Sequence, residues 1–404
     1  MRTLTDHATD NPATTTGQKQ ALLYVHVPFC RSRCTFCDWV QAIPNKDLTR
    51  RAGDPIRERY VEALCHEIRT RGPEYADKEI STIYWGGGTA SNLTEDETVR
   101  VMTAITETFD LNPLTESTIE CSPDTVDEDK LVMYRELGFN RVSSGVQSFD
   151  PDRLRSLGRR HSAEEARGLP DMARRAGFEH VSIDLMSGFA DQTNDELMES
   201  VETALTLPLD HLSLYSYRPT EGTHLRKKMD PKDKRDYIAQ QYALYAEARM
   251  RINEVLPEYG HGYFGRKSAF TTLYFQAKAD TLGFGSGAAS FSHQRLQLHR
   301  SGALHAYITN PLSFELDEPL DNDRTLISFI QAGLSTNEGI TRTDWSILTG
   351  TELLEVLDRT RIRPLADLLR HRGLIEDEQG IRLEPEVRNL TLIQLAFEMA
   401  VFES

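Results

Sequence analysis

Short apolar stretches alternate with helical patterns through the first half of the chain, and this alternation constrains the fold more than any other feature. The predicted strands begin near Ala21, Thr82, Ser117, Asn140, His180 and His211. Most are followed by a segment in which apolar residues recur at helical spacing. Alternating strands and helices form a parallel sheet with the helices outside. Six such units are too few for a complete eight-stranded barrel. The sequence therefore predicts an α/β fold, a partial (β/α)6 barrel resembling an incomplete TIM barrel and open on one side.

The helices between these strands are predicted from their apolar faces and their capping residues. Thr94 and Glu97 form a capping-box pattern at the start of a helix over Glu95–Phe109. A helix over Ala163–Ala176 is expected to be interrupted at Pro170. The remaining helices are predicted over Ile56–Arg71, Asp127–Leu137, Asn194–Leu205 and Lys232–Val255.

A cysteine-rich loop follows the first predicted strand. Cys30, Cys34 and Cys37 have C-x3-C-x2-C spacing, which is tight enough to bring three thiolates round one centre. Thiolates suit iron–sulfur clusters or zinc. Three ligands would leave one iron of a [4Fe–4S] cluster open to a substrate, whereas zinc usually takes four protein ligands. The alternatives are three buried cysteines, or a zinc loop completed by a histidine such as His26.

Composition excludes several classes of function. The formal net charge of −16 argues against a nucleic-acid-binding surface. No apolar run approaches the roughly 20 residues that span a bilayer. The other two of the five cysteines, Cys65 and Cys121, stand alone and are expected to be structural, so no disulfide framework is indicated. A reducing, cytoplasmic compartment is therefore expected.

Polar groups recur where predicted strands end. Gly86-Gly87-Gly88-Thr89, Glu120, Gln147 and Asp184 all lie at or just past such ends, which meet at one edge of a parallel sheet. The glycines expose backbone N–H groups to a ligand, or form only a tight turn. Glu120 either binds a ligand or forms an ion pair. Asp184 either binds a ligand or caps the segment that follows. Independent surface residues would not fall at this edge repeatedly, so a site is predicted there.

Two positions after the fourth strand are also candidates. Arg159 lies twelve residues beyond Gln147 and can bind the same ligand or form a surface ion pair. His161 can donate a proton, although a single histidine is more often structural.

The second half of the chain adds a glycine-rich segment and a helical region. Asp280–Ser290 reads as a strand and a tight turn, without the Lys-Ser/Thr of a phosphate-binding loop. From Arg324 onward, helical patterns precede a hairpin over Leu374–Leu383 that turns at Gln379-Gly380, which indicates a winged-helix-like domain. The predicted organisation is a flexible leader (1–19), a barrel core (20–255), a glycine-rich segment that closes the site (256–310) and a C-terminal helical, winged-helix-like domain (311–404).

The stretch from Tyr24 to Cys37, Tyr-Val-His-Val-Pro-Phe-Cys-Arg-Ser-Arg-Cys-Thr-Phe-Cys, resembles the cluster loop of radical S-adenosylmethionine enzymes. More narrowly, it resembles the family of oxygen-independent coproporphyrinogen III oxidase and heme chaperone, and motif similarity extends roughly over Leu22–Ser290. The resemblance implies a radical SAM barrel whose C-terminal domain is a lid over the substrate. It also implies a [4Fe–4S] cluster held by Cys30, Cys34 and Cys37, whose open iron binds the amino and carboxylate groups of S-adenosylmethionine. One electron then yields a 5′-deoxyadenosyl radical.

The same resemblance implies the residues and partners of the site. Arg218 and His161 are the candidate catalytic residues, and Arg218 is alternatively an exposed side chain. The expected partners are a small-molecule substrate and a one-electron donor such as flavodoxin or ferredoxin, with neither nucleic acid nor a membrane span. A second S-adenosylmethionine is expected as well. Cofactor contacts are implied for Tyr24, Phe36, Gly87, Gly88, Thr89, Glu120, Gln147, Arg159, Asp184, Arg218 and Ala289.

Departures from the family pattern decide the predicted reaction. Trp39 stands where the oxidase has a fourth cysteine, and the chaperone's His-Asn stretch is broken between His261 and Phe275. These departures favour a third branch, the methyltransferases and cyclopropanases of natural-product biosynthesis, which are thought to use two S-adenosylmethionine molecules. The sequence therefore predicts an enzyme that transfers a methylene or methyl group to an sp2 carbon of a small molecule. An oxygen-independent coproporphyrinogen III oxidase and a heme chaperone stay as alternatives.

Overall fold

A computed structural model describes residues 19–37, 55–189, 191–217, 234–299, 304–385 and 387–389. Its main element is a twelve-stranded sheet in the order β12-β11-β10-β9-β1-β2-β3-β4-β5-β6-β8-β7. Six neighbouring strands are parallel: β1 (Gln20–Val27), β2 (Glu79–Gly87), β3 (Glu116–Cys121), β4 (Arg141–Gln147), β5 (His180–Ser187) and β6 (His211–Ser216). The α/β fold with a partial (β/α)6 barrel is confirmed.

The two edges of the sheet were largely not predicted. Beyond β1, the parallel strand β9 (Asp280–Phe284) is followed by the antiparallel strands β10 (Ala289–Ser292), β11 (Arg295–Leu298) and β12 (Leu316–Pro319). Beyond β6 lie β8 (Tyr263–Gly265) and β7 (Glu258–Gly260), also antiparallel. In the part of the chain that is described, β12 and β7 do not pair with each other, so the barrel stays open.

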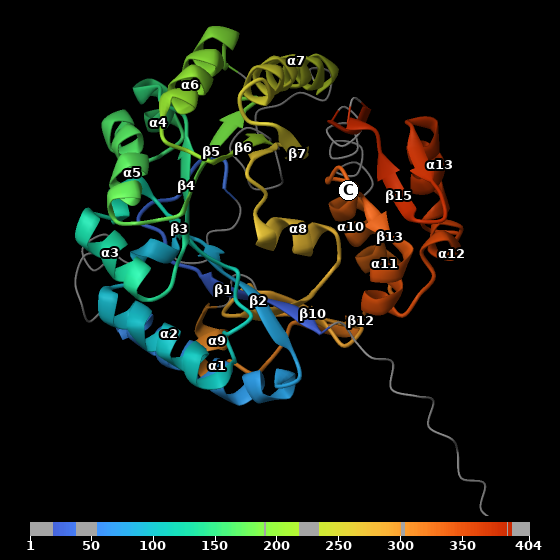
Figure 1. The fold of residues 1–404 in the computed structure, drawn as a ribbon, viewed down its shortest axis with the longest axis horizontal. Helices are drawn as coiled ribbons and strands as arrows, with labels where there is room; N and C mark the ends of the chain where they lie inside the picture. Colours follow the sequence, from blue (N-terminus) through green and yellow to red (C-terminus); the bar gives the residue numbers. More distant parts are fainter. Residues whose placement is uncertain are drawn as a thin grey trace, which may run out of the picture.

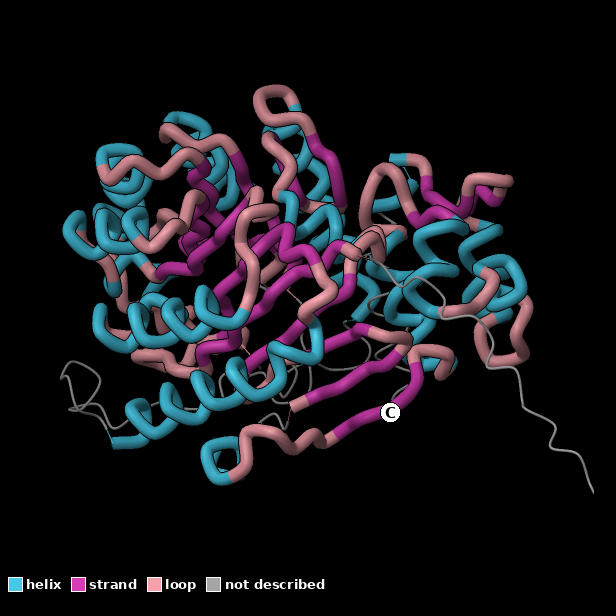
Figure 2. The backbone as a smooth tube through the Cα atoms, turned by 60° about the horizontal axis from the view of Figure 1, so that its bottom comes forward, coloured by secondary structure: helices cyan, strands magenta, loops and turns pink. Residues whose placement is uncertain are grey.

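Helices cover the outer face of the sheet, as Figures 1 and 2 show. Apolar side chains of β1 and β2 pack against α1 and α2 in a core that includes Val25, Leu64 and Trp85. Both faces of the parallel strands are buried, as expected when helices cover one side and the interior is filled. The covering helices are α1 (Pro55–Arg71), α2 (Glu95–Thr108), α3 (Glu128–Glu136), α4 (Pro151–Ser156), α5 (Ala163–Arg175), α6 (Asn194–Thr206), α7 (Lys234–Asn253) and α9 (Leu304–Thr309).

The capping box predicted for α2 is present. Thr94 Oγ1 accepts from the Glu97 backbone N–H, and the Glu97 carboxylate accepts from the Thr94 N–H. The predicted interruption at Pro170 is wrong, because α5 continues through it. Proline removes one backbone donor, and the buried face of Ala166, Leu169 and Ala173 holds the helix together across that gap.

Helix α8 (Ala269–Phe275) was missed by the sequence analysis and lies inside the arc of outer helices in Figure 1. Its N-terminus is held by Glu116 of β3, whose carboxylate accepts from the N–H groups of Ala269 (2.9 Å) and Phe270 (3.2 Å). The Phe270 ring then packs against Tyr84 of β2, with centroids 4.6 Å apart. Helix α8 therefore fills the barrel interior behind the strand ends.

The C-terminal region has a hydrophobic core of its own, centred on Trp345, Leu353 and Leu369. It contains α10 (Asp323–Gly333), α11 (Arg342–Thr349), α12 (Leu353–Leu357) and α13 (Arg363–His371), and a small sheet of β13 (Ile340–Thr341), β15 (Gly380–Leu383) and β14 (Leu374–Glu376). The predicted hairpin is β14–β15. Helices followed by a hairpin agree with a winged-helix-like arrangement, whereas the predicted domain boundaries, including the leader over 1–19, stay predictions.

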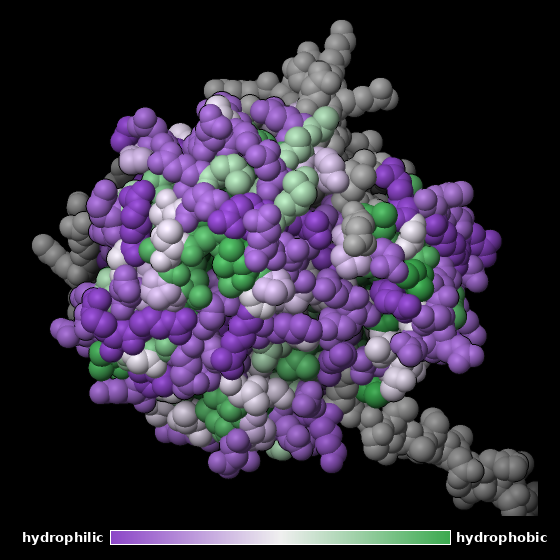
Figure 3. Space-filling model, turned by 45° about the horizontal axis from the view of Figure 1, so that its top comes forward, coloured by the Kyte–Doolittle hydropathy of each residue, from purple (hydrophilic) through white to green (hydrophobic). Residues whose placement is uncertain are grey.

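The surface is ordinary for a protein of this composition. Figure 3 shows a face covered mainly by hydrophilic residues, with small hydrophobic areas between them. Exposed large hydrophobic residues such as Tyr215 and Met250 are few. No helix in the described residues is long and apolar enough to cross a membrane.

Candidate active site

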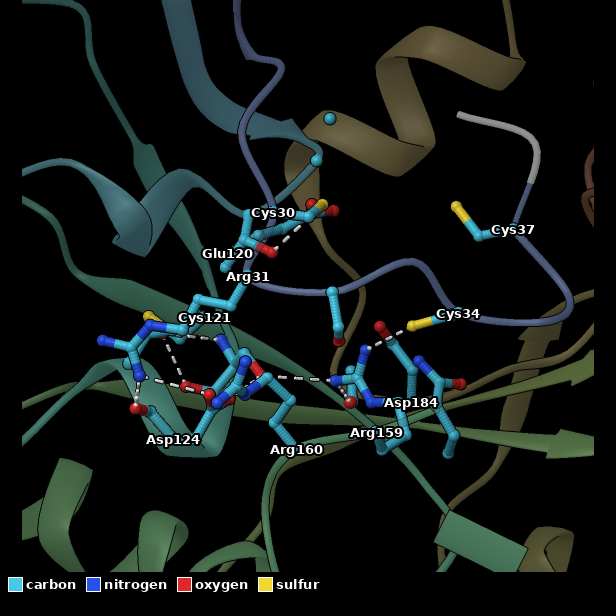
Figure 4. Close-up of a pocket in the computed structure, with 18 of the residues that line it drawn as sticks. Cys30, Arg31, Cys34, Cys37, Glu120, Cys121, Asp124, Arg159, Arg160 and Asp184 are labelled. Carbon is cyan, nitrogen blue, oxygen red and sulfur yellow. Dashed lines mark hydrogen bonds and ion pairs between the residues drawn. The ribbon is translucent and has the colours of Figure 1, made fainter. Parts of the chain in front are cut away.

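The C-terminal ends of β1 to β5 surround a cavity of about 190 Å³. It joins the cysteine loop to the strand ends, as Figure 4 shows. Eleven of the predicted site residues line this cavity: Cys30, Cys34, Phe36, Cys37, Gly87, Gly88, Thr89, Glu120, Gln147, Arg159 and Asp184.

The cysteine loop is held in place by the turn after α4. Ser32 Oγ donates to the Gly158 carbonyl at 3.0 Å, and the Thr35 N–H donates to the Leu157 carbonyl at 3.1 Å. A Cβ at Gly158 would lie only 3.0 Å from the Arg33 carbonyl oxygen, so a side chain there would crowd the loop. The loop is therefore fixed against α4 by backbone contacts.

Each of two thiols has a polar neighbour. Thr89 Oγ1 lies 3.6 Å from Cys30 Sγ, and Arg159 Nη1 lies 3.4 Å from Cys34 Sγ. Burial raises the pKa of Cys30 to about 11, which favours the thiol form of this side chain near neutral pH. A bound metal centre deprotonates its thiol ligands, and this loop places three such thiols on one cavity.

The cavity fits a group larger than one metal ion. Among the described residues, no three His, Cys, Asp or Glu side chains lie close enough together to hold a single ion. His26 does not complete a zinc site, because it is fully buried outside the cavity and its Nδ1 lies 3.2 Å from the Tyr24 hydroxyl. Three thiols round a wider space are the donor set of an iron–sulfur cluster, so the residues present fit a [4Fe–4S] cluster.

The glycines at the end of β2 keep the backbone open to the cavity. Gly87 has φ +107°, and a Cβ there would lie 2.6 Å from the His26 ring. A Cβ at Gly88 would lie 2.9 Å from the Pro28 carbonyl carbon. Only glycine fits both positions without displacing the start of the cysteine loop.

Two half-buried acidic residues, Glu120 at the end of β3 and Asp184 on β5, line the cavity on either side of β4. Burial, aided by repulsion from Asp184, raises the pKa of Glu120 to about 7, although the Tyr84 hydrogen bond opposes the rise. Burial likewise raises the pKa of Asp184 to about 6, against a hydrogen bond from Ser213. Such carboxyl groups can accept from the hydroxyls and ammonium group of a ligand.

Gln147 carries the clearest sign of a ligand site. Its φ is +70°, in the left-handed region that few non-glycine residues occupy. The register with β5 shifts between Gly145 and Gln147, so a bulge turns this side chain. Its Oε1 is buried and has no hydrogen-bond partner among the described residues. Backbone strain together with an unsatisfied polar atom indicates a place for a ligand donor.

Four predicted residues do not line the cavity or cannot be placed. Tyr24 is half-buried outside the lining, next to Tyr84 at a centroid distance of 6.2 Å. His161 is buried with Nε2 3.2 Å from the Val146 carbonyl, and burial lowers its pKa to about 4, so its position is that of a structural histidine. Ala289 lies in β10, outside the lining. Arg218 lies outside the described residues.

Several lining residues were missed. Asp124 forms an ion pair with Arg31 at 3.2 Å and accepts from Ser122 Oγ at 2.6 Å. Cys121, predicted to be structural, is buried but contributes to the lining. The Ser122-Pro123-Asp124 turn directly follows β3, so the rule that located Glu120 at the end of this strand could have found it. Arg160, next to Arg159, also lines the cavity.

Comparisons with known proteins agree with this geometry. The family model "Radical SAM superfamily" matches residues 24–204. Oxygen-independent coproporphyrinogen III oxidase of Salmonella typhimurium is 37% identical over 210 residues, 52% of this chain and 44% of the relative. Heme chaperone HemW of Bacillus subtilis is 36% identical over 194 residues (48% and 49%), and HemW of Synechocystis is 27% identical over 351 residues (83% and 82%). The match to the first two covers about half of their length.

A solved structure shares the fold over nearly the whole chain. Coproporphyrinogen III oxidase (HemN) from Escherichia coli, described as a radical SAM enzyme, superposes with a TM-score of 0.70 at 23% identity, covering 94% of this chain and 90% of that one. At this identity the likeness establishes the fold alone.

The predicted methyl or methylene transfer is wrong. The relatives at 37% and 36% identity are an oxidase and a heme chaperone, not methyltransferases or cyclopropanases. The missing fourth cysteine is a difference from the oxidase, and the broken His-Asn stretch is a difference from the chaperone. Neither difference is evidence for the methyltransferase and cyclopropanase branch.

Proposed function

We propose that this chain is a member of the radical SAM superfamily, whose model matches residues 24–204, and that it is an oxygen-independent coproporphyrinogen III oxidase-type enzyme, which decarboxylates a tetrapyrrole oxidatively. Its cofactors are a [4Fe–4S] cluster and S-adenosylmethionine, which together supply a 5′-deoxyadenosyl radical. The observation that carries the proposal is one cavity that joins three thiols to Gly87, Glu120 and Gln147. Identity to curated oxidases over half the chain supports the reaction type.

Each polar group of the cavity has a role in this proposal. Cys30, Cys34 and Cys37 hold the cluster. The open backbone at Gly87 and Gly88 binds the amino-acid part of S-adenosylmethionine. The Glu120 and Asp184 carboxyl groups accept from its ammonium group and its ribose hydroxyls.

The Gln147 amide at the end of β4 and the Arg159 guanidinium after α4 complete the cofactor contacts. Gln147 Oε1 accepts a hydrogen bond from the cofactor, since no donor among the described residues reaches it. Arg159 Nε is likewise buried without a partner among the described residues, and it binds the cofactor's carboxylate. A second S-adenosylmethionine, with Arg218 and Ala289 as contacts, stays a prediction.

The proposal is tested with anaerobically reconstituted protein, S-adenosylmethionine, dithionite and coproporphyrinogen III. We expect carbon dioxide and 5′-deoxyadenosine to form together, and a tetrapyrrole with fewer carboxyl groups to appear on chromatography. Formation of 5′-deoxyadenosine without any change in the tetrapyrrole would reject the substrate and retain the cofactor chemistry.

A heme chaperone is the second candidate. It is favoured by the match to HemW of Synechocystis, which extends over 83% of this chain. The Cys37-Asp38-Trp39 pattern is also closer to the chaperone. Stoichiometric heme binding with no decarboxylated product under the same conditions would select this function over the oxidase.

A further inference from the structure

Arg141 is a buried arginine whose charge is not paired within the described part of the chain. It is the first residue of β4 and only 5% exposed. Among the described residues, no carboxylate oxygen lies within 4.0 Å of its guanidinium group, and its side chain donates no hydrogen bond. Burial of a charge without a partner strongly destabilises a protein. An unpaired guanidinium group at such a position therefore indicates an anionic ligand.

Arg141 points into the barrel interior. Val142 and Val146 of the same strand pack in the hydrophobic cores beneath the outer helices, whereas Gly145 lines the cavity. Because side chains of a strand alternate between its two faces, Arg141 shares the inner face with Gly145 and lies deeper in the barrel. Its charge acts on side chains from four surrounding strands: Tyr84, Glu116, Asp184 and His211.

Glu116 is the carboxylate whose charge acts most strongly on Arg141, but α8 occupies both of its oxygens. Oε1 accepts from Ser268 Oγ at 2.7 Å, and Oε2 accepts from the Ala269 N–H at 2.9 Å. The guanidinium nitrogens of Arg141 are not fully enclosed, in contrast to Nε of Arg159. They are therefore open to another acceptor, and their planar arrangement fits the two oxygens of a carboxylate.

Aromatic rings beside Arg141 provide surface for the rest of such a ligand. The Tyr84 ring contacts Phe270 of α8, and no side chain of α8 is fully buried. From there a row of rings leads to β8 and β6, each ring contacting the next at centroid distances from 5.3 to 6.2 Å. We call this set the aromatic row: Phe270, Tyr274, Phe275, Tyr263 and Tyr215. Its last member, Tyr215, is 42% exposed, so the row joins the interior to the surface.

We propose that Arg141 is a substrate-binding residue whose guanidinium group pairs with a propionate carboxylate of the tetrapyrrole, while the pyrrole rings pack on the aromatic row. The inference rests on the proposed function, because it names the group that recognises the same substrate. Arg159 binds the carboxylate of the cofactor in the cavity, so each of the two arginines takes a different carboxylate. The Arg141 pair orients the macrocycle, because it holds one propionate deep in the barrel.

The test measures binding of coproporphyrin III, the fluorescent oxidised form of the proposed substrate, to the reconstituted protein under anaerobic conditions. In Arg141→Gln, which removes the charge, we expect the Kd to rise by roughly 10- to 100-fold. Arg141→Lys keeps the charge without the planar fork, so its Kd should lie between those of wild type and Arg141→Gln. The tetramethyl ester of coproporphyrin III has no carboxylate, and its Kd should differ by less than threefold between wild type and Arg141→Gln.

Two controls separate substrate binding from a general effect on the protein. The Kd of S-adenosylmethionine, measured by calorimetry, should stay within twofold of wild type in both Arg141 variants. Arg175→Gln is the matched substitution, because Arg175 is exposed at the end of α5 and pairs with Glu128 on the outside of the barrel. It should leave the Kd of coproporphyrin III within twofold of wild type.

An unchanged coproporphyrin Kd in both Arg141 variants, or an equal loss of affinity for the ester, would overturn the inference. A higher Kd for S-adenosylmethionine in these variants would overturn it too and assign Arg141 to the cofactor. If Arg141→Gln does not fold, Arg141→Lys alone decides. Wild-type protein that binds no coproporphyrin would reject the inference together with the proposed substrate, whereas binding without decarboxylation would reject only the proposed reaction.

Discussion

Tyr84 donates a 2.6 Å hydrogen bond to Oε1 of Glu120, and this pair joins β2 to β3 beside the cavity. The phenol is itself held by the Phe270 ring of α8. The orientation of a cavity carboxyl group therefore depends on a helix about 150 residues further along the chain. Burial raises the pKa of Glu120 to about 7 even with this hydrogen bond.

The first prediction concerns the pH dependence of folding. A carboxyl group with a raised pKa binds more protons in the native state than in the unfolded state between pH 4.5 and about 7. Its contribution therefore lowers the free energy of unfolding as the pH rises through that window. Glu120→Gln removes the contribution. We therefore compare the free energies of unfolding of the variant and of wild type by urea denaturation of the cluster-free proteins. The difference, variant minus wild type, should rise by on the order of 2–3 kcal/mol between acidic and mildly alkaline pH.

Glu136→Gln provides the control for this titration, because Glu136 is exposed at the end of α3. It should leave the pH profile of stability unchanged. A Glu120→Gln profile parallel to that of wild type would show that the pKa of Glu120 is not raised by folding.

The second prediction separates ligand cysteines from structural ones. Cys30→Ala, Cys34→Ala and Cys37→Ala should each lose the brown absorbance of the reconstituted cluster and all 5′-deoxyadenosine formation, because three thiolates are the minimum ligand set here. Cys65→Ala should keep both, since Cys65 is buried on α1 with its thiol directed at the Arg100 carbonyl. Cys121→Ala should keep the cluster as well, although Cys121 lines the cavity. Iron content and absorbance measure the outcome, and normal absorbance in any of the first three variants would contradict the ligand assignment.

Sequence reasoning located the strand ends, and with them most of the cavity, for a physical reason. Parallel strands present their C-terminal ends on one edge, so Glu120, Gln147 and Asp184 had to meet once the strands were assigned. The same logic could not find α8, because its short amphipathic pattern is stabilised by a distant residue, Glu116. The sequence could not show that His161 is a structural histidine either. That conclusion depends on its burial and on the contact of its Nε2 with the Val146 carbonyl, which only the structure gives.

Reaction type was the part that the sequence predicted wrongly. The motifs that fix the chemistry of the cofactor lie in the barrel, and these were interpreted correctly as far as the superfamily. The motifs by which the sequence compared the oxidase, the chaperone and the third branch lie at Trp39 and between His261 and Phe275, and there the family pattern is broken. Absence of a motif carries no physical information about what replaces it, and the assignment built on that absence failed.

The third prediction uses two glycines that share a left-handed backbone. Gly87 has φ +107° and Gly138 has φ +94°, but a Cβ at Gly87 would lie 2.6 Å from the His26 ring whereas one at Gly138 would meet nothing within 4 Å. Gly138→Ala should therefore cost only the backbone strain, about 1–2 kcal/mol. Gly87→Ala should cost more and should also abolish S-adenosylmethionine binding, measured by calorimetry on the reconstituted protein. Equal stability losses would show that the His26 ring moves aside freely.

The last prediction concerns a buried network that ties the glycine-rich segment to α1. The Glu67 carboxylate accepts from His299 Nε2 (2.6 Å), the Tyr307 hydroxyl (2.7 Å) and the Gly285 N–H (3.0 Å), and it pairs with Arg71. Although burial opposes ionisation, the contacts from His299 and Arg71 keep the pKa of Glu67 below its usual value, so the group is charged.

Glu67→Gln removes that charge while Arg71 stays buried. Breaking a buried ion pair on one side typically costs about 3–5 kcal/mol, and we expect a loss of that size in the free energy of unfolding with an unchanged denaturant slope. Glu62→Gln, on the exposed face of the same helix, should stay within about 0.5 kcal/mol of wild type. A loss below about 1 kcal/mol for Glu67→Gln would mean that Arg71 is satisfied by its other acceptors, the Gly283 carbonyl and Gln297. Tyr60 would remain a second contact from α1 to the glycine-rich turn, because its hydroxyl donates to the His26 carbonyl at 2.6 Å and accepts from the Ser286 N–H at 3.2 Å.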